Sequence, residues 1–152
     1  LGMTLQDLSI YTRLDIWSHG IVIVHMYTGQ IISKDATDNN ELLKVMAELM
    51  PNCGETYSRK MLKKCSSMKN YFTSDMEHLL MNSKHREENL PVRLKSLRQK
   101  KSIAQIVKCV KKPNSNSKKV QLLIDAICKC LVIDPQGRDD ATKIVNGLIK
   151  YR

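Results

Sequence analysis

The fold is decided by one stretch of the sequence, Asp15-Ile16-Trp17-Ser18-His19-Gly20-Ile21-Val22-Ile23-Val24-His25-Met26-Tyr27-Thr28-Gly29. Asp15 predicts a helix N-cap, because its side chain can accept a hydrogen bond from the first free amides. Gly29 suits the left-handed position just past a helix end. The apolar residues between them cover every side of a helix, which is typical of a helix buried at the centre of a domain.

A buried strand is the alternative for the same stretch, because Ile21 to Val24 form a short β-branched run. The two caps and the polar residues Ser18 and His25 favour the helix. A helix of this length is too short to span a bilayer, so we expect no membrane partner.

The polar and aromatic residues of the stretch follow a fixed pattern, Asp-x-Trp-Ser-x-Gly and then Tyr-Thr-Gly. The residues that carry it are Asp15, Trp17, Ser18, Gly20, Tyr27, Thr28 and Gly29. The pattern resembles the central helix of the C-terminal lobe of eukaryotic protein kinases. This resemblance implies a mainly α fold. Residues 1–152 would be a partial kinase domain, with the N-terminal lobe and the catalytic loop absent from this chain.

Further short motifs narrow the resemblance. Thr37-Asp38-Asn39-Asn40, Met50-Pro51-Asn52 and Arg59-Lys60 are similar to sequences of the pre-mRNA-splicing kinases of the CMGC group. Near the other end of the chain, Asp134-Pro135-Gln136-Gly137-Arg138 resembles the Asp-Pro-x-x-Arg of the kinase family. The resemblance covers Leu1 to Tyr151.

Length and composition indicate one globular domain. A chain of 152 residues with 42% apolar residues can bury a hydrophobic core, which must rest on Leu, Ile, Val and Met because aromatic residues make up only 5%. The cysteines are odd in number and lack paired spacing; they are Cys53, Cys65, Cys109, Cys128 and Cys130. No N-terminal apolar run reads as a signal peptide. We therefore expect reduced thiols in the nucleus or the cytoplasm.

One segment carries the whole net charge of +10. From Lys84 to Lys119 there are twelve lysines or arginines against two glutamates, whereas thirteen basic and thirteen acidic residues balance in the remainder. A basic insert at about 84–119 can bind phosphate-rich partners. A solvated surface insert explains the same composition. We prefer the second interpretation, because no aromatic residue in the segment could stack on a base.

Periodicity predicts a helix on each side of the insert. Asp38-Asn39-Asn40 can cap a helix that Pro51 ends. The apolar face of that helix would be Leu42, Leu43, Met46, Leu49 and Met50. Later in the chain, helical spacing predicts a second helix at Val120, Leu123, Ile124, Ile127, Cys128 and Leu131.

Two more helices are expected from caps. Ser102 can cap a short helix that carries Ile103, Ile106, Val107 and Val110. Asp139 or Asp140 caps the last helix. Its buried face would be Ile144, Val145, Leu148 and Ile149. Leu1 to Leu14 reads as a loop. Asn52 to Asn82 has no clear periodicity, but the aromatic pair Tyr71-Phe72 would anchor it.

Three residues are expected to support the catalytic and activation segments: Asp15, Trp17 and Arg138. The resemblance implies that Asp15 accepts hydrogen bonds from the catalytic loop, and that Arg138 forms a buried ion pair with the Glu of an Ala-Pro-Glu motif. Both partners would lie upstream of Leu1. This chain alone would then carry two orphaned polar groups and a central helix uncovered on one side. The alternatives are that Asp15 is only an N-cap and Arg138 a surface residue.

The chemistry of phosphoryl transfer is missing from the sequence. There is no Gly-x-Gly-x-x-Gly, no Val-Ala-x-Lys and no Asp-Phe-Gly. His85-Arg86-Glu87 has Glu for the catalytic Asp and lies on the wrong side of the central helix. We therefore predict no catalytic and no cofactor-binding residue in this chain. ATP and Mg²⁺ would bind only in the complete kinase domain.

Metal binding is not predicted either. His19 and His25 lie six residues apart, and Cys128 and Cys130 diverge on a helix. Neither pair offers three or four convergent ligands, which a zinc site needs.

The sequence leaves three functional hypotheses. The first is the C-lobe portion of a protein Ser/Thr kinase that transfers the ATP γ-phosphate to a protein substrate in pre-mRNA splicing, with the missing upstream kinase segments as its partners. The second is a pseudokinase or non-catalytic interaction module, because His25 stands where the family has Glu and Ile21 where it has a small residue. The third is a basic helical nucleic-acid binder that works through Lys95 to Lys119, an insert that could equally contact a splicing factor.

Overall fold

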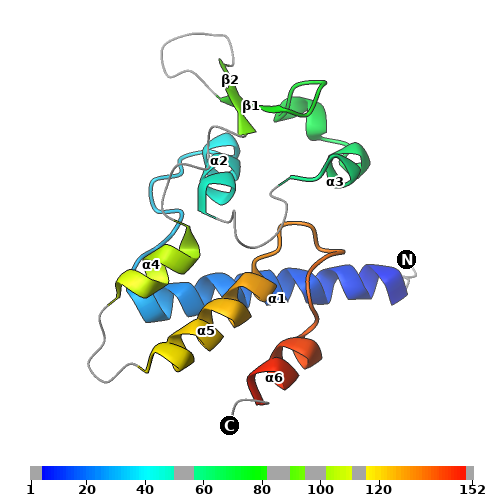
Figure 1. Cartoon of the computed structure of the whole chain (residues 1–152). Coiled ribbons are helices and arrows are strands. Elements are labelled where there is room, and N and C mark those ends of the chain that lie inside the picture. Colours follow the sequence, from blue (N-terminus) through cyan, green and yellow to red (C-terminus); the bar gives the residue numbers. More distant parts are fainter. Residues whose placement is uncertain (1–4, 50–56, 82–89, 95–101, 111–115, 150–152) are drawn as a thin grey trace.

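The computed structural model describes residues 5–49, 57–81, 90–94, 102–110 and 116–149. The helices are α1 (Leu5–Thr28), α2 (Asn39–Leu49), α3 (Arg59–Lys64), α4 (Ile103–Cys109), α5 (Ser117–Cys130) and α6 (Ala141–Ile149). A single 3₁₀ turn, η1 (Met68–Asn70), and an antiparallel hairpin of β1 (His78–Met81) and β2 (Leu90–Arg93) complete the described elements. The prediction of a mainly α fold is confirmed (Figure 1).

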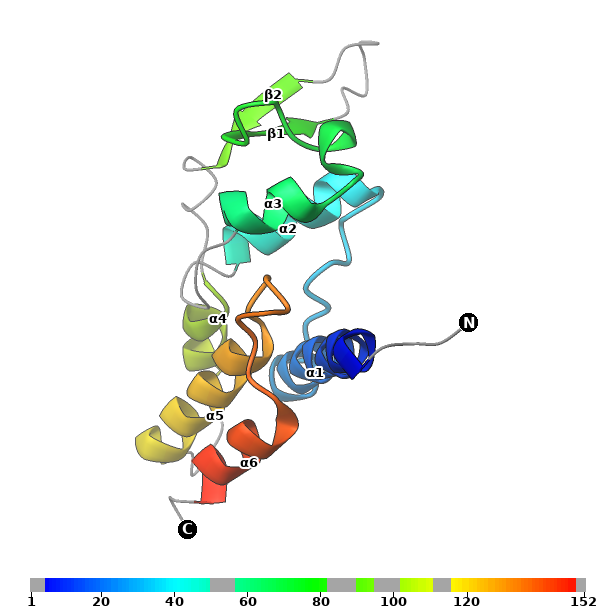
Figure 2. The ribbon, with the colours of Figure 1, turned by 90° about the vertical axis from the view of Figure 1, so that its right-hand side faces the viewer.

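The elements form two groups around two hydrophobic clusters. The long helix α1 packs against α4 and α5, and α6 packs on α5 (Figure 1). Turned by 90°, the molecule shows α2, α3 and the hairpin together on the other side (Figure 2). Tyr57 and Met61 pack against both clusters, so they join the two groups.

The larger cluster lies between α1, α4 and α5. Its most deeply buried side chains are Val24, Ile103, Val107, Ile127 and Leu131. The described part of the basic insert therefore contributes core residues, and the prediction of a solvated surface insert is wrong for α4. Lys95 to Lys101 and residues 111–115 lie outside the described residues, so nucleic-acid binding through them stays a prediction.

The start of α1 corrects one prediction. The helix begins at Leu5, so residues 5–14 are not a loop and Asp15 is not an N-cap. No Gly or Pro interrupts residues 5 to 14, and Arg13 is hydrogen-bonded to a distant loop, which holds the extra turns. The predicted end is confirmed, because Gly29 has φ +70 and its N–H donates to the carbonyl of His25 at 2.8 Å.

One face of α1 is open to solvent. Val24 is fully buried, whereas Val22 is 52% and Met26 75% exposed. Tyr11 and Leu14 are exposed as well. The sequence predicted a central helix that is uncovered on one side, and the described elements leave α1 in that state. None of the described helices is long and apolar enough to cross a membrane.

The smaller cluster consists of Leu62, Phe72 and Leu79. Phe72 is 5% exposed, which confirms that the aromatic pair anchors this segment. The strand β1 was not predicted, because Asn52 to Asn82 lacks an alternating pattern. The side chain of Asn40 on α2 donates to the carbonyl of Leu80 on β1, which ties the hairpin to the helix.

Side-chain caps fix the ends of the other helices. Asp38 accepts a hydrogen bond from the N–H of Glu41 at 2.8 Å, and Ser102 forms a capping box with Gln105. Asp140, rather than Asp139, caps α6 and accepts from the N–H of Lys143 at 2.8 Å. The predicted helices at these positions and at α5 are confirmed.

The predicted buried face of α6 is largely wrong. Ile144 is 9% exposed and packs in the larger cluster, but Val145, Leu148 and Ile149 are 49%, 42% and 56% exposed. Amphipathic spacing predicted that all four side chains are buried, but of these four only Ile144 belongs to the larger cluster.

Gly20 on α1 packs against Cys130 and Leu131 at the end of α5. A Cβ at Gly20 would lie 2.7 Å from the Cβ of Cys130 and 2.8 Å from Cδ2 of Leu131. We expect Gly20→Ala to lower the free energy of unfolding by about 1–3 kcal/mol through overpacking, as measured by urea denaturation. Gly147→Ala is the control, because its Cβ would meet only the flexible end of Lys129. A Gly20→Ala protein as stable as the Gly147→Ala protein would contradict this packing.

Burial also couples stability to alkaline pH through Tyr57. Its hydroxyl donates to the carbonyl of Leu43 at 2.8 Å, its ring meets Phe72 edge-on, and burial raises its pKa. Below the pKa of about 10 that tyrosine has in the unfolded chain, this shift makes its whole contribution to the free energy of unfolding. The contribution is lost as the pH rises towards the pKa of Tyr57 in the folded protein. We expect urea midpoints to fall above about pH 10, and less steeply in Tyr57→Phe. Tyr11→Phe, at an exposed position, should keep the wild-type slope.

Candidate functional site

The structure brings together two of the three residues that the sequence predicted as a site. Trp17 lies on α1, and Arg138 lies at the end of the loop between α5 and α6. The Cζ atom of Arg138 is 5.0 Å from the centroid of the Trp17 ring. This is a cation–π contact, in which the indole face partly compensates the buried charge.

Arg138 is buried and has hydrogen-bond partners. It is 4% exposed. Its Nε donates to the carbonyl of Val132 at 2.9 Å, its Nη2 to that of Ile133 at 3.2 Å, and its Nη1 to the carbonyl of Arg13. Among the described residues no carboxylate forms an ion pair with it. Arg138 is therefore neither a surface residue nor orphaned, and the expectation of an orphaned group is wrong because carbonyl oxygens take the place of the acid.

Burial lowers the pKa of Arg138. A guanidinium has an ordinary pKa so high that it stays charged at neutral pH in spite of this shift. Burial likewise raises the pKa of Cys130, with the charge of Arg138 opposing it, so the thiol stays protonated. Among the described residues, Cys65, Cys109, Cys128 and Cys130 are not joined in disulfides, and Cys53 lies outside the described residues.

Sequence reasoning missed a second arginine at this site. The Nη1 atom of Arg13 donates to the carbonyls of Pro135 at 2.7 Å and Gln136 at 2.8 Å. Arg13 and Arg138 thus each bind backbone that the other's segment provides. We name Arg13, Trp17, Arg138 and the loop 132–136 the arginine clasp. The signal was available, because Arg13 precedes Trp17 by four residues and so shares its helix face.

A tight turn presents the carbonyls to the clasp. Asp134 accepts a hydrogen bond from the N–H of Gln136 at 2.9 Å, and the N–H of Gly137 donates to the Asp134 carbonyl at 3.0 Å. Pro135 fixes its own φ, which suits the second position of such a turn. The Asp-Pro-x-x-Arg spacing therefore returns the chain so that the Arg138 guanidinium meets α1.

Asp15 is not part of this cluster. It lies in the middle of α1, is exposed, and its carboxylate makes no hydrogen bond to another described residue. Its backbone carbonyl pairs with Nδ1 of His19 at 2.8 Å. His19 and His25 are also exposed. In the described ranges no three His, Cys, Asp or Glu residues gather as a metal site would require.

An apolar cleft opens beside Trp17, between α1 and α2. It has a volume of about 400 Å³ and a lining of Trp17, Ser18, Ile21, Val22, Ile32, Ser33, Leu42, Val45 and Met46. Trp17 therefore contacts the guanidinium of Arg138 and also lines this cleft. An apolar segment seated in the cleft would contact the same indole that Arg138 contacts.

The two arginines should act as a unit. We expect Arg138→Met to lower the free energy of unfolding by about 2–4 kcal/mol, because three carbonyls lose their donor, and Arg13→Met by about 1 kcal/mol. The double variant should show a coupling energy of about 1 kcal/mol, since the two clasp halves hold the same junction. Emission of Trp17, the one tryptophan in the sequence, reports the site directly.

Arg59→Met is the control for this cycle. Arg59 forms an exposed ion pair with Glu77 at 2.9 Å, so its loss should change stability by less than about 0.5 kcal/mol. Additive effects of the Arg13 and Arg138 substitutions, or unchanged Trp17 emission in Arg138→Met, would contradict the clasp.

Two curated proteins that are similar in sequence to this chain are serine/threonine-protein kinases. No model of a protein family matches the chain. The chain is 30% identical over 131 residues to the serine/threonine-protein kinase prp4 of Schizosaccharomyces pombe, covering 82% of this chain and 26% of the relative. It is 28% identical over 132 residues to the serine/threonine-protein kinase prpf4B of Dictyostelium discoideum, covering 82% of this chain and 15% of the relative.

The chain thus spans about a quarter of the length of the first of these relatives and less of the second. The predicted mainly helical, C-lobe-like fold agrees with the structure and with this partial match. Over four fifths of its length, the chain is related to serine/threonine-protein kinases.

Proposed function

We propose that this chain is the C-lobe portion of a Ser/Thr protein kinase of the CMGC group, most like the splicing kinases. In the complete domain it would brace the catalytic loop and the activation segment while the γ-phosphate of ATP is transferred to Ser or Thr of a protein substrate. The observation that carries the proposal is the buried Arg138 guanidinium stacked on Trp17. These are two of the residues that the kinase resemblance assigns to this supporting role.

The open surface of α1 supports the same proposal. The exposed Asp15 carboxylate is free among the described residues to accept hydrogen bonds from backbone amides of a catalytic loop. Further along the same helix, Val22 and Met26 are exposed apolar side chains, and the cleft beside Trp17 could take an apolar part of the activation segment. A helix that is apolar on all sides is stable only when such surface is covered.

The chain would contribute support rather than chemistry. ATP and Mg²⁺ would be held by residues of the complete kinase domain, and no residue of this chain is assigned to them. The protein substrate and the upstream kinase segments are the partners that this role requires. Free cysteines are consistent with the reducing interior of the nucleus or the cytoplasm, where pre-mRNA processing kinases would act.

One observation favours the second candidate, a pseudokinase lobe that acts as an interaction module. The clasp satisfies Arg138 with carbonyls of Val132, Ile133 and Arg13, so the junction of α1 with the last two helices closes without an acid from an activation segment. His25, where active kinases have Glu, is exposed on α1 and leaves the clasp intact.

Nucleotide binding tests the proposal. We expect the 152-residue chain to show no thermal shift with ATP and Mg²⁺. A product extended through the coding sequence upstream of Leu1 should show a shift, since ligand at 100 times Kd stabilises by about 2.7 kcal/mol. The extended product should also phosphorylate Ser or Thr in a protein substrate, and Arg138→Met should lower its kcat more than Arg59→Met does.

The outcomes separate the two candidates. An upstream sequence with intact His-Arg-Asp, Asp-Phe-Gly and Ala-Pro-Glu motifs together with measured phosphorylation supports the kinase. Broken motifs and an inactive extended product support the pseudokinase. A thermal shift of the 152-residue chain with ATP would contradict the assignment of ATP binding to residues outside it.

A further inference from the structure

The short helix α3 and the turn after it carry a dense positive charge. Arg59, Lys60, Lys63, Lys64 and Lys69 occur in a stretch of the sequence, 58–74, that has no Asp or Glu. All five are exposed. Arg59 pairs with Glu77, but among the described residues the four lysines form no ion pair. Although the residues outside the basic insert have no net charge, they therefore include a second, local basic surface.

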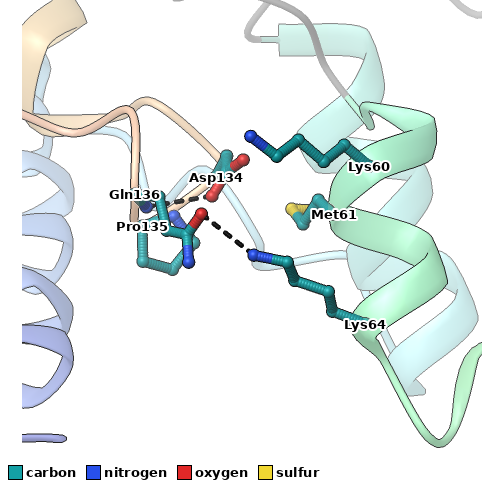
Figure 3. A pocket seen from close by; sticks show the side chains of 6 residues that line it. All are labelled: Lys60, Met61, Lys64, Asp134, Pro135 and Gln136. Atoms are coloured by element: carbon teal, nitrogen blue, oxygen red, sulfur yellow. Dashed lines mark hydrogen bonds between the residues drawn. The ribbon is translucent and has the colours of Figure 1, made fainter. Parts of the chain in front are cut away.

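Two of these lysines line a cleft. Ser58 caps α3, and the spacing of four residues places Lys60 and Lys64 on one side of the helix. Figure 3 shows both side chains reaching towards the loop between α5 and α6, with Met61 between them. The Nζ atom of Lys64 donates to Oε1 of Gln136 at 3.2 Å.

The interior of the cleft is apolar, and its edge is charged. Its lining is Lys60, Met61, Lys64, Asp134, Pro135 and Gln136, and its volume is about 170 Å³. Met61 and Pro135 provide apolar surface. The lysine stems add to it, because long cationic side chains keep only their ends in water. The Asp134 carboxylate, which accepts from the N–H of Gln136, is the one acid of the lining.

These features exclude two classes of ligand. A volume of about 170 Å³ is smaller than the roughly 300–1,000 Å³ of sites for small-molecule ligands. No aromatic side chain lines the cleft, so a nucleic-acid base has nothing on which to stack. The space suits a single aliphatic side chain, and the lysines suit anionic groups on each side of it.

We propose that the cleft between α3 and the loop 134–136 binds an acidic segment of a partner protein. One aliphatic side chain of that segment packs between Met61 and Pro135, and flanking carboxylates pair with Lys60 and Lys64. Asp134 repels carboxylates from the loop side, so the acidic side chains lie over α3. The proposal is independent of the kinase assignment, because it rests only on the charge and shape of this surface.

Peptide binding to charge-reversed variants tests the proposal. The probe is a short fluorescent peptide in which one leucine is flanked on both sides by glutamates, followed by anisotropy at low and at physiological salt. We expect Lys60→Glu/Lys64→Glu to weaken binding by about tenfold or more, because it turns two attractive contacts into repulsive ones. Lys63→Glu/Lys69→Glu is the matched control. It makes the same charge change on α3 and the following turn but outside the lining, and should cost less than about threefold.

Three further measurements distinguish specific binding in the cleft from general electrostatic attraction. A peptide with serine in place of leucine should bind about tenfold more weakly if the aliphatic side chain is buried. Asp134→Asn keeps the side-chain acceptor for the Gln136 N–H and removes the charge, so it should strengthen binding. Lys60→Gln/Lys64→Gln, which removes charge without reversing it, should weaken binding to an intermediate degree, and circular dichroism checks that each variant is folded.

Three results would overturn the proposal. Equal losses in the two charge-reversed variants would indicate diffuse attraction rather than a cleft. Equal binding of the leucine and serine peptides would remove the apolar contact. Tighter binding of oligouridylate RNA than of the peptide at the same salt, lost in Lys60→Glu/Lys64→Glu, would make the surface a nucleic-acid site instead.

Discussion

The structure depends on the burial of one permanent positive charge. The Arg138 guanidinium does not lose its proton when it is buried in a low-dielectric site. Its N–H groups therefore need hydrogen-bond acceptors, and its positive charge needs compensation. Three backbone carbonyls and the Trp17 indole meet that requirement without a carboxylate. Val132 and Ile133 offer their carbonyls from the loop between α5 and α6, and Arg13 offers its carbonyl from α1, so the buried guanidinium joins this loop to α1.

The consequences spread from the clasp to both groups of elements. Arg13 holds the carbonyls of Pro135 and Gln136, and α1 begins about three turns before Asp15, where a sequence-based N-cap would have started it. The same loop forms one wall of the cleft opposite α3 and accepts a hydrogen bond from Lys64. The loop is thus shared: its backbone serves the larger cluster, and its side chains face the group that holds α3 and the hairpin.

The sequence could predict those helix ends that depend on hydrogen bonds between residues close together in the chain. The end of α1 at Gly29 and the cap of α4 at Ser102 rest on hydrogen bonds within a few residues, and both were predicted correctly. The start of α1 could not be predicted, because Arg13 holds it through contacts more than a hundred residues away. The predicted burial of Val145 on α6 was wrong for a similar reason, because amphipathic spacing does not say which neighbouring element covers a helix face. At the site, motif spacing identified Trp17 and Arg138 but not the carbonyls that replace an acid.

The clasp also defines how the two candidate functions differ physically. A guanidinium has five N–H groups, and Arg138 uses three of them on described carbonyls. Two remain for a carboxylate, but at 4% exposure the side chain is reached only if the junction of α1 and the loop loosens. An activation segment that supplies a Glu would have to compete with, or add to, the contacts that Arg13 already makes with the same loop. In an active kinase that competition would couple the position of the activation segment to the junction. In a pseudokinase lobe the clasp would stay closed, and the open face of α1 would be available to another protein.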